Sequence, residues 1–310
     1  MDPWIIALVA VSAVLHLAWN VRLKTSGDPL RAATIGMLAG CLGIVPVGFA
    51  VWWLQGQQAL PGEGIALGVV SGLVEAAYFI LLAAAYRRGD LSVVYPVARG
   101  TAPLLAVIIG VVVLGERLGV AGSLGVIALL AGFLWLQRPW RAVALAQRGG
   151  ARAGARRAGA GARRAAADSA ILFALATGVM IATYTAIDRV GTRQIDPFPY
   201  AAILWVTCSV VLVAWVAFVA GGDLLRYGPE ASGRAAVGGV LTLGAYLCIL
   251  VALSVAPLSG VAPLRESATV FAAAWGSVRM GEARDSREAV RRIGASVLIV
   301  GGALLLAVGS

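Results

Sequence analysis

HLAWNVRLKTSGDP at residues 16–29 returns 168 positions later as YTAIDRVGTRQIDP at residues 184–197. The two stretches share few identities, but both carry polar residues at the same helix-spaced positions and both close on an Asp-Pro pair. With two single-residue deletions, the same register extends over residues 16–116 and residues 184–282. The spacing indicates that one unit has been duplicated.

Marker residues keep this register along both copies. They pair His16 with Tyr184, Asn20 with Asp188, Tyr78 with Tyr246, Pro96 with Pro263, and Glu116 with Glu282. Each copy holds five apolar segments, and an odd number of membrane crossings turns the second copy upside down relative to the first. Inverted repeats of this kind are typical of secondary transporters.

The composition is that of an integral membrane protein. Hydrophobic residues make up 60% of the chain, charged residues 13%, and the mean hydropathy is +0.88, far from the values of soluble domains. A helix needs about 20 apolar residues to cross a bilayer. Ten stretches qualify, at residues 3–21, 32–54, 64–86, 91–114, 118–136, 169–187, 197–220, 235–254, 258–279 and 291–308. We therefore expect an all-α membrane protein with ten transmembrane helices in a 5+5 inverted repeat.

The expected organisation is a five-helix repeat at residues 1–137, a linker at 138–168 and a second repeat at 169–310. The linker is rich in Arg, Ala and Gly, and its eight arginines account for most of the net charge of +10, since +10 − 8 leaves +2. Such a segment is expected to be a flexible, solvated connection. Attraction to anionic lipids of the inner leaflet is the alternative, whereas the charge pattern argues against a nucleic-acid partner.

The distribution of Lys and Arg predicts the orientation. Twenty of them lie in loops and span ends that follow odd-numbered spans, and three, Arg117, Arg189 and Arg193, lie on the opposite side. By the positive-inside rule the side with 20 charges is cytoplasmic. We expect both termini outside and the linker inside, in the cytoplasmic membrane of a bacterium. The three cysteines lie in apolar segments without metal-ligand spacing, so neither a disulfide nor a metal site is expected.

Ionisable residues at bilayer depth are costly and usually mark a pathway or a binding site. Glu75 is the strongest candidate, because it is the only charge between Gly64 and Tyr86. Tyr78 shares its helix face. A structural carboxylate satisfied by a neighbouring helix, for instance through Arg99, is the alternative to a contact with a substrate amine or a proton-carrying role.

Proline residues accompany the other charges in both copies. Arg99 follows Pro96, and the adjacent Arg265 and Glu266 follow Pro263. Proline tends to break or kink a helix and frees carbonyls that can line a cavity. A guanidinium at such a place can grip a carboxylate or phosphate, or it can pair with a nearby glutamate.

His16 and Asn20 lie four residues apart on one helix face and are candidates to line the same cavity. The alternative for His16 is a packed side chain held by a hydrogen bond. Its partner in the duplication is Tyr184, and Asp188 stands where Asn20 does, although Asp188 and Arg189 lie near a span end and could sit at the membrane surface.

These residues together resemble the drug/metabolite transporter superfamily, specifically its ten-span members built from two EamA domains. The stretches on which this resemblance rests are HLAWN at 16–20 with GDP at 27–29, AAYRRGDLSVVYP at 84–96, VLGE at 113–116, APLSGVAP at 256–263 and GE at 281–282. The resemblance implies a helical bundle in which spans 1–4 and 6–9 surround a central cavity and spans 5 and 10 are peripheral. It also implies transport of small metabolites, often efflux of amino acids or drugs.

We therefore expect a secondary transporter for a small metabolite, such as an amino acid, another zwitterion or an anion, with efflux as the favoured direction. The expected substrate contacts are Glu75, Arg99, Arg265, Glu266, His16, Asn20 and Tyr78. No cofactor is expected, lipid surrounds the protein, proton coupling is an option, and the assembly is a monomer or a homodimer. An enzyme is not expected, because the chain has neither a P-loop nor a nucleophile elbow. A lipid flippase or a non-transporting membrane scaffold or sensor is the alternative.

Overall fold

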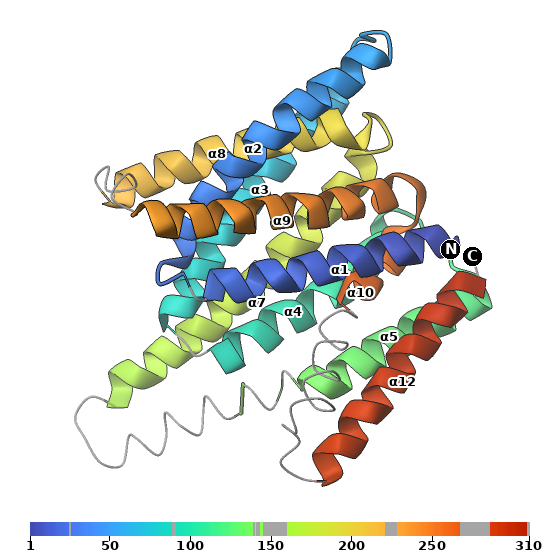
Figure 1. Ribbon diagram of the computed structural model, residues 1–310. Helices are drawn as coiled ribbons and strands as arrows, with labels where there is room; N and C mark the ends of the chain where they lie inside the picture. The colour runs from blue at the N-terminus through green and yellow to red at the C-terminus, as the bar shows by residue number, and fades with distance from the viewer. Residues whose placement is uncertain are drawn as a thin grey trace.

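The computed structural model describes residues 1–24, 26–88, 91–138, 140, 143–144, 160–220, 228–266 and 286–308. All elements of regular structure in these ranges are helices (Figure 1). They are α1 (Pro3–Lys24), α2 (Pro29–Leu54), α3 (Gly62–Arg88), α4 (Leu91–Ile108), the π-helix η1 (Ile109–Val113), α5 (Val120–Gln137), α7 (Ala160–Gly191), α8 (Pro197–Ala220), α9 (Pro229–Val255), α10 (Leu258–Glu266) and α12 (Ser286–Val308).

The helices follow the apolar runs of the sequence. Within the described residues, five helices are long and apolar enough to cross a membrane, and four shorter apolar helices accompany them. The expectation of an all-α membrane protein is thereby confirmed. Part of the expected ninth span, residues 267–279, lies outside the described residues.

The first helix of the second half begins inside the expected linker. The helix α7 begins at Ala160 rather than near residue 169, so the last residues of the Arg/Ala/Gly-rich segment are helical. Alanine has the highest intrinsic helix propensity and arginine is also a good helix former. Residues 145–159 of the expected linker lie outside the described part of the chain.

Helices from the first half of the sequence lie mainly against helices from the second half. The principal contacts are α3 with α7 and α8, α1 and α2 with α9, α2 with α8, α4 with α7 and α10, and α5 with α12. Figure 1 shows α5 and α12 side by side at the edge of the bundle. Although a short connection joins α3 to α4, these two helices barely touch, because α7 lies against both of them. Two consecutive spans joined by a short loop would be expected to pack as antiparallel neighbours, and this pair does not.

Glycines permit the closest helix approaches. A Cβ at Gly68 would lie 3.0 Å from Ile203 on α8, and one at Gly72 would lie 2.7 Å from the Cβ of Thr207. The stripe of Gly64, Gly68 and Gly72 is thus a packing surface, as small residues at every fourth position usually are in membrane helices. On the other side of the bundle, Gly36 of α2 and Gly239 of α9 bring two backbones together.

Gly239→Ala is expected to destabilise the protein, because the added methyl would overlap the carbonyl of Gly36. Backbone atoms cannot turn aside as a side chain can, and overpacking of this kind typically costs about 1–3 kcal/mol. The matched control is Gly233→Ala on the same helix, where a Cβ meets nothing within 4 Å. Thermal unfolding in detergent should show a lower melting temperature for the first variant only; equal melting of both would refute this crossing.

Candidate functional site

Charged side chains from both halves of the sequence are buried inside the bundle. Glu75 on α3, Arg99 on α4 and Arg265 on α10 are 4%, 5% and 9% exposed. The charge of Arg265 acts on both Glu75 and His16, so these groups lie within electrostatic range of one another. Because uncompensated charge at bilayer depth costs at least a few kcal/mol, opposite charges brought together in this way lower that cost.

His16 and Arg99 form a direct contact between α1 and α4. A guanidinium nitrogen of Arg99 is hydrogen-bonded to Nε2 of His16, and since a guanidinium can only donate, the imidazole nitrogen accepts. Among the described residues no hydrogen bond or ion pair joins Arg99 to Glu75, and one carboxylate oxygen of Glu75 has no hydrogen-bond partner there. A buried acceptor without a partner is unusual in a native structure and asks for an explanation.

The remaining predicted site residues lie on the same helices. Asn20 is on α1, one turn beyond His16, and Glu266 is the last residue of α10. The side chains of Asn20 and Glu266 lie outside the described part of the chain. Tyr78 is buried on α3, one turn beyond Glu75.

Tyr78 begins a row of aromatic rings that crosses the bundle from α3 to α8. Its ring centroid lies 5.9 Å from that of Tyr184 on α7, and Tyr184 lies 5.9 Å from Tyr246 on α9, both pairs meeting edge to face at 71°. Trp205 on α8 follows at 5.7 Å from Tyr246. The Arg265 guanidinium lies over the Tyr246 ring, 5.3 Å from its centroid, within the range of a cation–π interaction.

Asp188 holds four helices together next to this row. Its carboxylate accepts hydrogen bonds from Ser71 on α3 at 2.5 Å, from Tyr200 on α8 at 2.9 Å and from the hydroxyl of Tyr246 on α9. The residue is fully buried. The sequence left open a position at the membrane surface; the structure shows that the carboxylate is enclosed by protein. The three donors supply the partners that a buried carboxylate needs.

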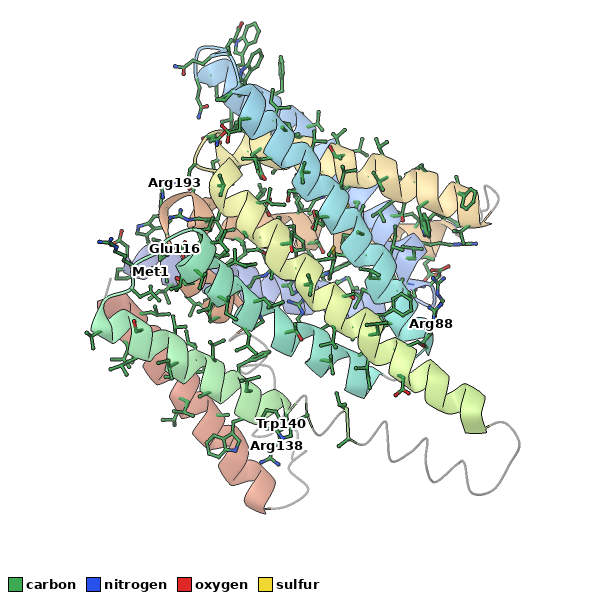
Figure 2. The ribbon with its side chains drawn as sticks, turned by 180° about the vertical axis from the view of Figure 1, so that it is seen from behind. Met1, Arg88, Glu116, Arg138, Trp140 and Arg193 are labelled. Atoms are coloured by element: carbon green, nitrogen blue, oxygen red, sulfur yellow. The ribbon has the colours of Figure 1, made fainter. Side chains whose placement is uncertain are left out.

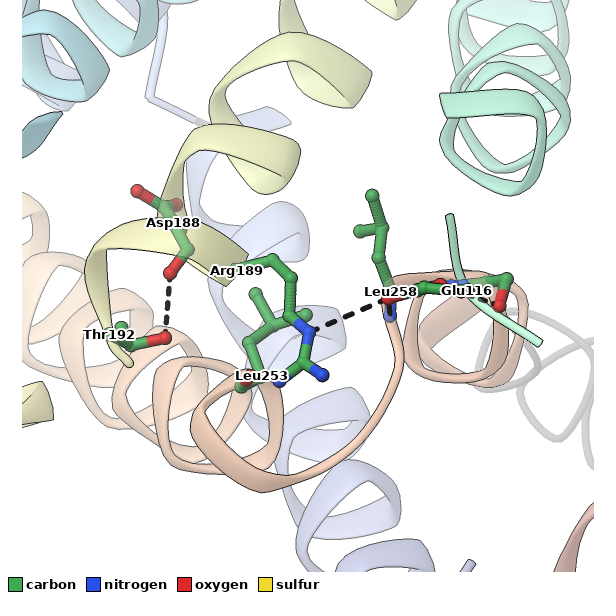
Figure 3. A network of polar contacts seen from close by, with 7 residues as sticks. Glu116, Asp188, Arg189, Thr192, Leu253 and Leu258 are labelled. Carbon is green, nitrogen blue, oxygen red and sulfur yellow. Dashed lines mark hydrogen bonds and ion pairs between the residues drawn. The ribbon is translucent and has the colours of Figure 1, made fainter. Parts of the chain in front are cut away.

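The next residue, Arg189, joins a second polar network near the end of α7 (Figure 3). One guanidinium nitrogen donates to the carbonyl of Leu253 at 2.5 Å, and another lies 3.5 Å from the carboxylate of Glu116. That carboxylate also accepts from the backbone N–H groups of Leu258 and Ser259, at 2.6 and 2.9 Å, and from the Ser259 hydroxyl at 2.7 Å. Glu116 therefore caps α10 from a distant part of the chain.

The geometry explains why a glycine precedes this glutamate. The N-terminus of a helix carries unsatisfied N–H groups and a partial positive charge, both of which a carboxylate satisfies. After η1 the chain turns through Gly115, whose φ of +65° is a conformation that favours glycine. The turn aims Glu116 at α10.

A narrow cavity lies beside Arg265. Its volume is about 10 Å³, and Pro103, Thr185 and Val261 are among the residues that line it together with Arg265. That volume holds about one water molecule. Glu75 and Arg99 do not line it, so the state described here leaves no room for a metabolite at this place.

The profile of the EamA-like transporter family matches residues 2–137 and again residues 168–308. The chain belongs to the EamA-like transporter family. The resemblance to the drug/metabolite transporter superfamily drawn from the sequence is thus confirmed. This EamA protein is a multi-pass membrane protein of a transporter family rather than of an enzyme family.

The fold of the EamA protein also occurs in solved structures. One of them, described only as "Crystal structure of protein", superposes with a TM-score of 0.66 at 19% identity and covers 99% of this chain and 98% of its own. At that identity the likeness concerns the fold alone. No curated protein matches the chain significantly.

Several residues that organise the centre of the EamA protein were not predicted. The sequence contains a signal for two of them, because the duplication pairs Asp188 with Asn20 and Tyr246 with Tyr78. It also marks Glu116 through the repeated Gly-Glu pair. Ser71 and Tyr200 carry no comparable signal, since neither their type nor their spacing distinguishes them from other polar residues in apolar helices.

Proposed function

We propose that this EamA protein is a secondary transporter that moves a small metabolite across the cytoplasmic membrane of a bacterium by alternating access. The observation that carries the proposal is the buried group of Glu75, Arg99 and Arg265, which brings charges of both signs from both halves of the chain into the bundle. Beyond this group, Asp188 links four helices and Glu116 caps α10. A solute can reach such a centre only if helices move apart on one side at a time.

The proposed architecture is two five-helix repeats, residues 1–137 and 169–310, joined by residues 138–168 and related by a two-fold axis in the membrane plane. The helix contacts support it. If α1 is exchanged with α7, α2 with α8, α3 with α9, α4 with α10 and α5 with α12, the contact of α3 with α7 becomes that of α9 with α1. Likewise α4 with α7 becomes α10 with α1, and α2 with α9 becomes α8 with α3, and all of these contacts occur.

The proposed orientation has both termini outside the cytoplasm. The two ends of the chain lie close together at one end of the bundle (Figure 1). Arg88 and Arg138 lie toward the other end (Figure 2), and they belong to the 20 basic residues that the positive-inside rule assigns to the cytoplasm.

Alkaline phosphatase fused after Ser310 is therefore expected to be active, and a green fluorescent protein at the same place is expected to stay dark. A phosphatase inserted after Gly150, in the arginine-rich segment, serves as the matched control and should be inactive. Enzyme activity and whole-cell fluorescence measure the outcome. The reverse pattern, with a fluorescent C-terminal fusion, would refute the orientation.

The chemistry of the centre indicates the class of cargo. A carboxylate can bind an amine, and guanidinium groups can bind a carboxylate or a phosphate. A site with both negative and positive side chains therefore suits a zwitterion such as an amino acid, or an anion. Aromatic edges and faces beside these charges add apolar contact area. His16, Asn20, Tyr78 and Glu266 complete the proposed substrate contacts, export is the proposed direction, and Glu75 is the proposed carrier of a coupled proton.

The test is transport by the purified protein in liposomes. A panel of radiolabelled amino acids and small carboxylates is offered with and without a pH gradient, and saturable uptake of at least one above that of empty liposomes is expected. Stimulation by the gradient would support proton coupling. Movement of fluorescent lipid without movement of any solute would favour a lipid flippase, and movement of neither would favour a scaffold or sensor.

A further inference from the structure

A cleft of about 420 Å³ opens at the end of the bundle where the chain begins. It lies where the loop between η1 and α5, the end of α7 and the beginning of α10 come together. Four charged residues line it: Glu116, Arg117, Arg189 and Arg193. Figure 2 shows Met1, Glu116 and Arg193 grouped at this end. The volume is within the range of small-molecule sites, about 300–1,000 Å³.

The basic character of this cleft is not what the topology predicts. Outside the membrane spans, only three Lys or Arg residues lie on this side of the sequence's alternating loops, against 20 on the other. Those three are Arg117, Arg189 and Arg193, and all of them line the one cleft. This side of the protein is otherwise depleted in basic residues, and all three that it has line the same cleft.

Two of the three guanidinium groups are available to a ligand. Arg117 and Arg193 are exposed, and no carboxylate among the residues that the structure describes lies within salt-bridge distance of either. Arg189 is buried and shares its guanidinium between Glu116 and the carbonyl of Leu253. The positive charge of Arg193 also acts on Arg189, so an anion between them would relieve a repulsion.

Glu116 does not neutralise the cleft. Counting side chains alone, three arginines against one glutamate leave a formal charge of +2 on its walls. The carboxylate of Glu116 is moreover committed to the N-terminus of α10 through three hydrogen bonds. Of the four charged side chains of the cleft, Arg117 and Arg193 are therefore the two exposed ones.

We propose that this cleft binds the carboxylate or phosphate group of an organic anion, with Arg117 and Arg193 as its principal contacts. Guanidinium groups present pairs of N–H donors whose spacing matches the oxygens of carboxylates and phosphates. The anion belongs either to a soluble metabolite that arrives from this side or to the headgroup of an anionic lipid. The site does not depend on the transport function proposed above, so binding without transport leaves it standing.

The test uses the full-length protein in nanodiscs of neutral phosphatidylcholine, with succinate and inorganic phosphate as probes and chloride at equal ionic strength as the reference. Isothermal titration should show saturable binding of at least one probe to the wild type. The double variant Arg117→Gln, Arg193→Gln should bind it at least about tenfold more weakly, a difference of about 1.4 kcal/mol. Both side chains are exposed, so the melting temperature should stay that of the wild type.

The matched control is the double variant Arg31→Gln, Arg234→Gln, which removes two guanidinium groups that pair with Asp28 and Glu230 elsewhere on the protein. It should bind the probe as the wild type does. Equal affinity of all three proteins for the probe would overturn the proposal. So would the absence of saturable binding of either probe in both neutral and anionic nanodiscs.

Anionic lipid distinguishes the two sources of the ligand. If phosphatidylglycerol in the nanodisc weakens probe binding to the wild type, a lipid headgroup occupies the cleft. If the probe binds equally well in both lipids, the cleft serves a soluble anion. Both outcomes support the site, and only the second makes it a candidate recruitment point for cargo.

Discussion

Glu75→Gln is expected to reduce transport by about a hundredfold, which corresponds to about 2.7 kcal/mol of lost stabilisation. The substitution keeps the shape of the side chain and removes its charge. The charge of Arg265 acts on Glu75, and a cargo amine or a coupled proton would need the same carboxylate. The measurement is initial flux in proteoliposomes, together with the melting temperature in detergent.

A loss of fold is not expected to cause this effect, since one carboxylate oxygen of Glu75 has no hydrogen-bond partner among the described residues. The matched control is Glu63→Gln, the same change on the same helix at an exposed position in its first turn. It should transport as the wild type does. Normal flux in Glu75→Gln would exclude a role in transport, and a large drop in its melting temperature would show that the carboxylate is structural.

Asp188→Ala is expected to destabilise the folded protein by on the order of 3 kcal/mol, because it leaves three buried hydroxyl groups without their charged acceptor. These hydroxyls belong to Ser71, Tyr200 and Tyr246, on three different helices. Thermal and denaturant unfolding in detergent would measure the loss.

Asp168→Ala is the matched control for this experiment, because Asp168 is exposed on the same helix α7. Its stability should equal that of the wild type. The stability of Asp188→Asn should lie between that of Asp188→Ala and that of Asp168→Ala, since the amide retains one acceptor oxygen for these hydroxyls. If Asp188→Ala unfolds at the temperature of the wild type, the hydrogen bonds around Asp188 contribute little and the helices are held by packing alone.

The sequence by itself determined the helices and the family. In lipid every backbone polar group must be satisfied within the segment, so an apolar run of sufficient length becomes a helix whatever surrounds it. Residues 197–220 were expected to span the membrane, and α8 is Pro197–Ala220. The duplication is likewise a property of the linear order of residues. Together with the quoted motifs, it was enough to identify the family. The burial of Glu75, Arg99 and Arg265 followed from their depth in apolar runs.

Only the tertiary structure decided which of these helices meet. A soluble helix shows its buried face by alternation of apolar and polar residues, but these spans are apolar on the faces that meet lipid and on the faces that meet protein alike. Sequence order misled in the case of α3 and α4, because α7 from the other half lies against both. The hydrogen bond of Ser259 to Glu116 joins residues 143 positions apart, and that of Ser71 to Asp188 joins residues 117 positions apart. Such contacts depend on how each helix is rotated and how closely glycines let it approach, and neither is encoded in hydropathy.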